Sequence, residues 1–136
     1  MIPEDLKHLD ASTIAARNTI SFSSNQALID LVCAHAAKLD VAPGHLAAKL
    51  VAKALGLFQE VTDNISPATV IADWTSIAEA YAGADTPWLF VAHRPLVIKL
   101  RLTACEFEVT TSAMANLLLA KGLEQHLEQE ASDAKR

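Results

Sequence analysis

The sequence predicts a mostly α-helical domain with a small β component. Its 136 residues suit one compact domain, and a hydrophobic content of 51% is enough to fill a core. Aromatic residues make up only 5%, which favours close packing of helices over a large β-sandwich. We expect a single domain over 1–136, with a strand–helix–helix unit at 18–58, an acidic helical segment at 59–93, and a strand followed by a C-terminal helix at 94–130.

The clearest predicted strand is the stretch Thr-Ile-Ser-Phe-Ser near the N-terminus. Its alternation places Ile20 and Phe22 on one face and three small hydroxyl residues, Thr19, Ser21 and Ser23, on the other. So short a strand buries little surface alone, so we expect it to pair with a second strand.

Apolar residues at helical spacing, together with cap and breaker residues, predict the helices. They run from about Asn25 to Leu39, from Pro43 or Gly44 to Leu55, from Pro67 to about Ala82, and from about 110–112 to Gln129, with a further short helix opening at Pro3. Ser66 is the predicted N-cap of the helix at Pro67, worth about 1 kcal/mol. Gly56 and Gly83 are predicted to end helices. Gly122, inside the last helix, predicts close packing or a kink.

Two more strands are predicted in the second half. Trp88–Val91 is a short apolar run typical of a buried strand. Leu96–Leu102 alternates, which places Lys99 and Arg101 together on one face. The segment that follows either continues as a hairpin or begins the last helix. Both cysteines, Cys33 and Cys105, lie on apolar segments and are expected to be buried free thiols, with a single disulfide as the alternative.

The charge is unevenly distributed. The net charge of −5 argues against indiscriminate binding of nucleic acid. Residues 17–53 and 94–121 each carry four basic residues against two acidic ones, whereas 54–93 contain no Lys or Arg. No apolar run is long enough for a membrane span, and the first residues lack the features of a signal peptide, so we expect a cytoplasmic protein and no membrane partner.

The order strand, helix, tight turn, helix over Asn18–Phe58 resembles the ribbon-helix-helix family of DNA-binding proteins. In that family two short strands pair antiparallel into a ribbon, the ribbon enters the major groove, and the start of the second helix lies on a phosphate. The strand here carries hydroxyls where the family commonly has Lys, Arg, Gln or Asn, and its turn is Asp40-Val41-Ala42 where the family often has Gly, an apolar residue, then Ser or Thr. The resemblance implies nucleic-acid contacts at Thr19, Ser21, Ser23, Gly44, His45 and Lys49.

The second half contains a possible echo of this unit at 96–127. Leu96–Leu102 resembles the ribbon strand, which adds Lys99 and Arg101 to the expected DNA contacts, and Thr111–Leu127 resembles the second helix. Only about ten residues separate them, too few for a full helix between. If the repeat is genuine, the two strands pair within one chain as a pseudo-dimer; otherwise a homodimer pairs through residues 19–23.

No catalytic or cofactor-binding motif is present, so we expect no enzyme, no cofactor and no metal site. The five His residues are scattered; His35 lies on an apolar stripe and is expected in the core, and His93-Arg94 is placed to line a pocket. The sequence favours a DNA-binding protein that contacts double-stranded DNA, such as a transcriptional repressor or a plasmid or phage accessory factor. The alternative is a non-enzymatic adaptor, chaperone or inhibitor that binds a protein partner through the acidic segment 60–85.

Overall fold

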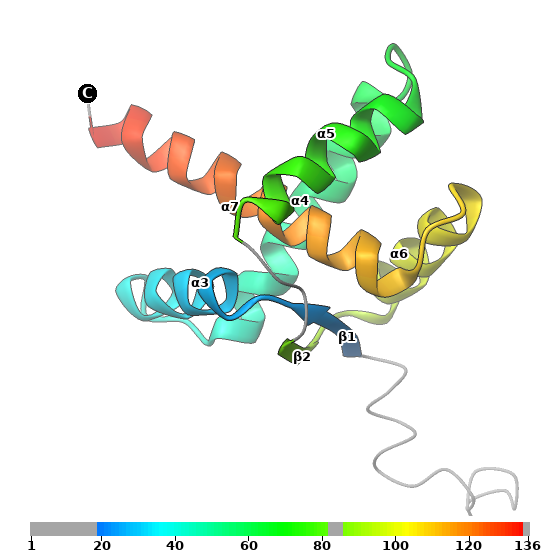
Figure 1. Ribbon diagram of the computed structural model, residues 1–136. Coiled ribbons are helices and arrows are strands. Elements are labelled where there is room, and N and C mark those ends of the chain that lie inside the picture. The colour runs from blue at the N-terminus through cyan, green and yellow to red at the C-terminus, as the bar shows by residue number, and fades with distance from the viewer. Residues whose placement is uncertain (1–18, 82–85, 135–136) are drawn as a thin grey trace, which may run out of the picture.

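The computed structural model describes residues 19–81 and 86–134, which form five helices and two strands (Figure 1). The elements are β1 Thr19–Ser24, α3 Gln26–Lys38, α4 Pro43–Val61, α5 Pro67–Glu79, β2 Thr86–Val91, α6 Arg94–Glu106 and α7 Thr111–Ala134. The expected class, mostly helical with a small β component, is confirmed. The helix expected at Pro3 and the cap expected at Gly83 lie outside the described residues.

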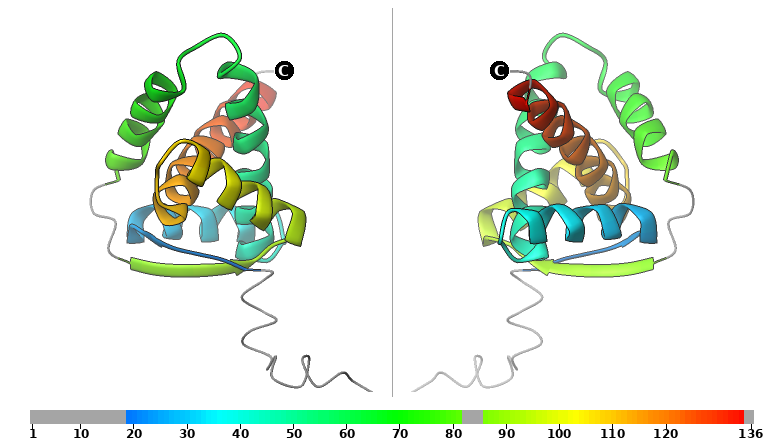
Figure 2. Two further views of the ribbon diagram at one scale, coloured as in Figure 1. Left: turned by 90° about the vertical axis from the view of Figure 1, so that its right-hand side faces the viewer. Right: turned by 90° about the vertical axis from the view of Figure 1, so that its left-hand side faces the viewer.

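The two strands form an antiparallel ribbon at one border of the molecule, with the helices on one side of it (Figure 2). As predicted, Ile20 and Phe22 point inward and are 2% and 4% exposed. They pair across the ribbon with Phe90 and Trp88, respectively. The ring of Phe22 lies 5.9 Å from that of Phe90 and 6.0 Å from that of Trp88. The partner strand of β1 therefore comes from the same chain.

The strand predicted at Leu96–Leu102 is wrong, because this segment lies within helix α6. Two patterns coexist in it, and the helical one prevails: Val97, Leu100 and Ala104 face the core, as a helix with apolar residues three and four apart requires. Ile98 and Leu102, which an alternating strand would have buried beside Leu100, are 44% and 65% exposed. Pro95 lies in the first helical turn, where proline is tolerated.

The same change of element alters the expectations for neighbouring residues. Lys99 and Arg101 lie on an exposed part of a helix and not on a strand face. Cys105 is an exposed free thiol, contrary to its expected burial, and Cys33 is a half-buried free thiol.

The chain contains two strand–helix–helix units related by a shift of 68 residues. Helix α6 begins and ends 68 residues after α3 (Gln26 to Arg94, Lys38 to Glu106). The residue two places after each of these helices, Asp40 or Glu108, has φ = 58°. These left-handed residues end both helices in the same way, and the second unit is β2–α6–α7 rather than the predicted 96–127.

Hydrogen bonds in the two turns repeat with the same shift. The N–H of Val41 donates to the carbonyl of Ala36, and that of Val109 donates to the carbonyl of Ala104, both at 3.0 Å. These bonds run back from the residue that follows each left-handed position to the last turn of the helix, as in the Schellman motif. The turn expected at 40–44 is therefore present, and an equivalent turn joins α6 to α7.

The units face each other about the middle of the ribbon. Ser21 pairs with Leu89, which is the residue 68 places later, so the register obeys the same shift as the helices. Helix α4 packs on α7 and on β2, and α7 packs on β1, so each unit's second helix covers the other unit's strand (Figure 2). The two units thus share one core.

Helices α4 and α7 make that core at equivalent positions. Buried pairs 68 residues apart are Leu46 and Met114, Leu50 and Leu118, Val51 and Leu119, Ala54 and Gly122, and Leu55 and Leu123. A Cβ on Gly122 would lie 2.5 Å from the carbonyl oxygen of Leu50, so glycine allows the close approach that the sequence predicted as one alternative.

Helix α4 continues past Gly56, which was expected to end it, and runs to Val61. A glycine inside a helix costs about 1 kcal/mol relative to alanine. Burial of Leu55 and Phe58 on either side of Gly56 offsets this cost, because both side chains are 1% exposed.

Helix α5 lies between the two units and packs on α7 through Val70, Trp74 and Ala78. It begins at Pro67 as predicted but ends at Glu79, before the predicted Ala82. Ser66 occupies the N-cap position without a side-chain capping hydrogen bond, so its predicted contribution of about 1 kcal/mol is wrong.

Asn25 supplies the cap of α3 that the sequence predicted at this position. Its side-chain oxygen accepts a hydrogen bond from the N–H of Leu28 at 2.7 Å.

Within the described part of the chain, no single helix has both the length and the apolar character to cross a membrane. Helices α3 and α4 reach that measure only as a pair, and the chain bends by 108° between them.

Candidate nucleic-acid interface

The outward side of the ribbon is an open surface, which we call the ribbon face. It carries hydroxyl residues on β1 and apolar residues on β2: Thr19, Ser21, Ser23, Pro87, Leu89 and Val91. Leu89 and Val91 are 59% and 69% exposed and are two residues apart on one strand, so they form a small apolar patch. The ribbon face therefore offers hydrogen-bonding hydroxyls and methyl groups but no charge of its own.

The start of α4 lies directly against β2. A Cβ on Gly44 would be 3.1 Å from the Cβ of Phe90, so the absence of a side chain at Gly44 permits this contact. Ala42, at the N-cap, makes no side-chain hydrogen bond, and the first helical N–H to donate backwards is that of Leu46, to Ala42. The N–H groups of Gly44 and His45 come before it, in the turn where a helix attracts anions.

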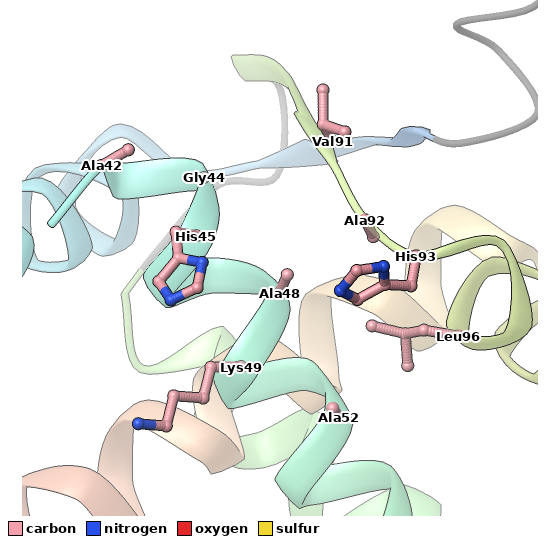
Figure 3. Close-up of a pocket in the computed structure, with 10 residues that line it drawn as sticks. All are labelled: Ala42, Gly44, His45, Ala48, Lys49, Ala52, Val91, Ala92, His93 and Leu96. Carbon is pink, nitrogen blue, oxygen red and sulfur yellow. The ribbon is translucent and has the colours of Figure 1, made fainter.

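A hollow of about 800 Å³ opens beside this helix start (Figure 3). His45 and Lys49 line it from α4, and His93 lines it from the segment that joins β2 to α6. Ala48 and Leu96 give it an apolar lining. The prediction that His93 would line a pocket is thus confirmed, and the hollow combines nitrogen donors with apolar surface at the end of the ribbon.

Arg101 lies on the other side of the ribbon. It lines a smaller hollow of about 320 Å³ together with Thr19 and Ser21. The structure therefore gathers the predicted site residues into two groups, Gly44 with His45 and Lys49 at one flank, and Thr19 and Ser21 with Arg101 at the other. Lys99 lies on α6 outside both linings.

The second unit lacks an equivalent open helix start. The hydroxyl of Thr110 accepts a hydrogen bond from the N–H of Ala113 at 3.0 Å, which caps α7. Ser112 is likewise engaged, because its Oγ accepts a hydrogen bond from the N–H of Ser23 at 2.8 Å. Glu79 of α5 lines the adjoining hollow, where a carboxylate repels an anion. The site is thus open at α4 and closed to anions at α7.

Comparison of the chain with protein-family models, with curated proteins and with solved structures finds no match.

Proposed function

We propose that the protein binds double-stranded DNA through the ribbon face, as a single-chain counterpart of a ribbon-helix-helix protein. One observation carries the proposal: an antiparallel ribbon lies between two strand–helix–helix units related by a constant shift of 68 residues. The ribbon-helix-helix family assembles such a ribbon from two strands, and the resemblance of 18–58 to that family is its sequence counterpart.

The chemistry of the ribbon face suits the major groove. The groove is about 12 Å wide and admits a two-stranded ribbon, and Ser and Thr hydroxyls both donate to and accept from base edges. Ser21 lies at the centre of the ribbon, opposite Leu89. The methyl groups of Leu89 and Val91 suit contact with the C5-methyl group of thymine.

Phosphate contacts fall to the flanks of the ribbon. The amides of Gly44 and His45 lie at the open start of α4, and Lys49 follows one turn later. Arg101 supplies a guanidinium at the opposite flank and Lys99 an ammonium further along α6. Because these contacts displace condensed counterions, binding is expected to weaken steeply with salt.

The proposal predicts the effect of removing single charges. Lys49→Gln and Arg101→Gln should each weaken binding to a generic duplex and reduce the slope of log affinity against log salt by about 1. Fluorescence anisotropy between about 50 and about 200 mM salt measures both quantities. Lys53→Gln is the matched control, because Lys53 is exposed one turn further along α4 and does not line the hollow. Thermal unfolding of each variant separates loss of binding from loss of fold.

Affinity at low salt no better than that of an unrelated acidic protein would refute the proposal. An equal effect of Lys53→Gln and Lys49→Gln would refute the assigned orientation. The biological role we propose is that of a transcriptional repressor or a plasmid or phage accessory factor in the cytosol.

A second candidate function is supported by α5, which has no counterpart in the repeat. With the end of α4 it presents exposed acidic residues: Glu60, Asp63, Asp73 and Glu79. Burial and the nearby Glu124 carboxylate raise the pKa of Tyr81, so its phenol remains neutral at pH 7 beside this acidic surface. Such a surface suits a basic protein partner.

Charge reversal tests this candidate. Asp63→Lys, Asp73→Lys and Glu79→Lys together should abolish recovery of a partner in a pull-down and leave duplex affinity at least as strong as before. Undiminished recovery of the partner would count against an acidic docking surface. Any partner that the wild-type chain captures must also resist the Lys49→Gln change, since Lys49 lies outside this surface.

A further inference from the structure

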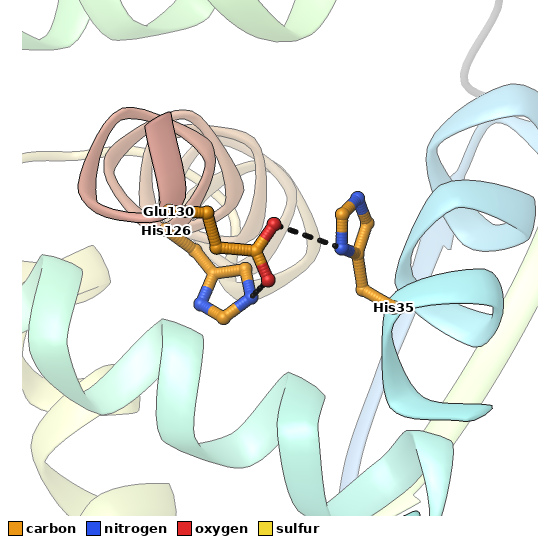
Figure 4. Close-up of side chains that lie close together, drawn as sticks. All are labelled: His35, His126 and Glu130. Carbon is orange, nitrogen blue, oxygen red and sulfur yellow. Dashed lines mark ion pairs between the residues drawn. The ribbon is translucent and has the colours of Figure 1, made fainter. Parts of the chain in front are cut away.

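Three potential metal ligands converge between α3 and the second half of α7 (Figure 4). The Nδ1 atom of His35 lies 3.6 Å from one carboxylate oxygen of Glu130, and the Nε2 atom of His126 lies 3.3 Å from the other. All three ligand atoms lie within 4.8 Å of one another. His126 and Glu130 are four residues apart and so share a face of α7.

Both imidazole nitrogens that point into this cluster are shielded from water. Neither His35 Nδ1 nor His126 Nε2 makes a hydrogen bond to another described atom. Their distances to Glu130 exceed the range of about 2.7–3.2 Å for an N–H···O hydrogen bond. Two ligands about 2.1 Å from a tetrahedral metal ion lie about 3.4 Å apart, which matches the observed spacing.

The internal repeat supplies a comparison for this cluster. The positions 68 residues away from His35, His126 and Glu130 are Thr103, Phe58 and Thr62. There the ring of Phe58 lies 5.6 Å from that of Trp74 and 5.3 Å from that of Phe107, in apolar packing.

Both threonine hydroxyls at that end are satisfied locally. Thr103 donates to the carbonyl of Lys99 and Thr62 to that of Phe58, each at 2.7 Å. The fold therefore does not require unpaired polar groups at this depth, and the nitrogens of the cluster await a partner.

We propose that His35, His126 and Glu130 bind a divalent transition-metal ion of the zinc type. Two imidazoles and one carboxylate suit Zn²⁺, whereas Ca²⁺ and Mg²⁺ prefer oxygen ligands. Bound there, the ion ties α3 to α7, the contact that Phe58 makes by packing at the other end of the repeat. Lys38, whose Nζ lies 3.9 Å from Glu130, is 69% exposed and is able to swing its charge into solvent when the ion binds.

Metal titration of the full chain, stripped with a chelator beforehand, tests the proposal. Zn²⁺ should bind one per chain and raise the midpoint of thermal unfolding, Co²⁺ should give a visible d–d spectrum, and Mg²⁺ should do neither. His126→Phe is the preferred variant, because phenylalanine already packs at the equivalent position 58. It should weaken Zn²⁺ binding at least about 100-fold while the protein stays folded, and Glu130→Gln should weaken it about 10- to 100-fold.

His45→Asn and His93→Asn are the controls, because both histidines lie outside the cluster, beside the hollow at the start of α4. They should leave Zn²⁺ affinity unchanged. Unaltered binding in His126→Phe, equal loss in a control variant, or no saturable Zn²⁺ binding by the wild-type chain would each overturn the proposal. None of these outcomes depends on DNA binding, so the two proposals stand or fall separately.

Discussion

Replacing Phe22 by alanine is expected to lower the free energy of unfolding by about 3–5 kcal/mol. Its ring is 4% exposed and packs against the rings of Trp88 and Phe90, so alanine would leave a cavity between the ribbon and the helices. Urea denaturation followed by tryptophan fluorescence measures the change, and Trp88 reports on the ribbon directly.

Leu89→Ala is the matched control within the same ribbon. Leu89 lies on the ribbon face and is 59% exposed, so its truncation should change stability by no more than about 0.5 kcal/mol. Equal losses in the two variants would mean that the ribbon does not present Phe22 to the core and Leu89 to solvent. This pair of variants therefore tests the alternation on which the ribbon face depends.

Replacing Gly122 by alanine is expected to lower the free energy of unfolding by about 1–3 kcal/mol. The new Cβ would lie 2.5 Å from the carbonyl oxygen and 2.9 Å from the Cβ of Leu50. Since one of these atoms belongs to the backbone of α4, the two helices must move apart along their whole contact. Urea denaturation again measures the loss, and circular dichroism checks that the helices persist.

The same substitution in the partner helix should have the opposite sign. Gly56 lies inside α4, and the position that an added Cβ would take has no atom of another element within 4 Å. Gly56→Ala should therefore raise the free energy of unfolding by about 0.5–1 kcal/mol. Stabilisation by both substitutions would contradict the close approach at Gly122.

The first unit was largely predictable from its sequence. Ile20 and Phe22 alternate without a competing helical pattern, and Asn25 and Pro43 mark the starts of α3 and α4. The exposed hydroxyl side of the strand followed from the same alternation. Local signals therefore sufficed wherever a single period was present.

The second unit was not predictable in the same way. Residues 96–102 satisfy both a strand and a helix period, and packing of Val97, Leu100 and Ala104 against the core decides between them. Taking this helix for a strand left too few residues for a complete repeat. The actual strand, β2, has Trp88 and Phe90 where β1 has Ile20 and Phe22, so the repeat lies in geometry more than in residue identity.

The candidate sites depended on contacts between distant parts of the chain. Arg101 reaches Thr19 and Ser21 only because α6 packs beside β1, which no local pattern announces. His35 was expected to be a core residue, and its partner His126 is 91 residues away in the sequence. The spacing of His126 and Glu130 was the one local signal, since four residues place both on one helical face.

Fusion of the two strands into one chain has a consequence for the sequence that the ribbon would read. A ribbon built from two copies of one strand carries a true dyad, and its operators are correspondingly palindromic. Here one half of the ribbon presents Ser21 and its neighbours and the other presents Leu89 and Val91, and each can diverge independently. We therefore expect any preferred operator to be asymmetric, with a fixed polarity along the duplex.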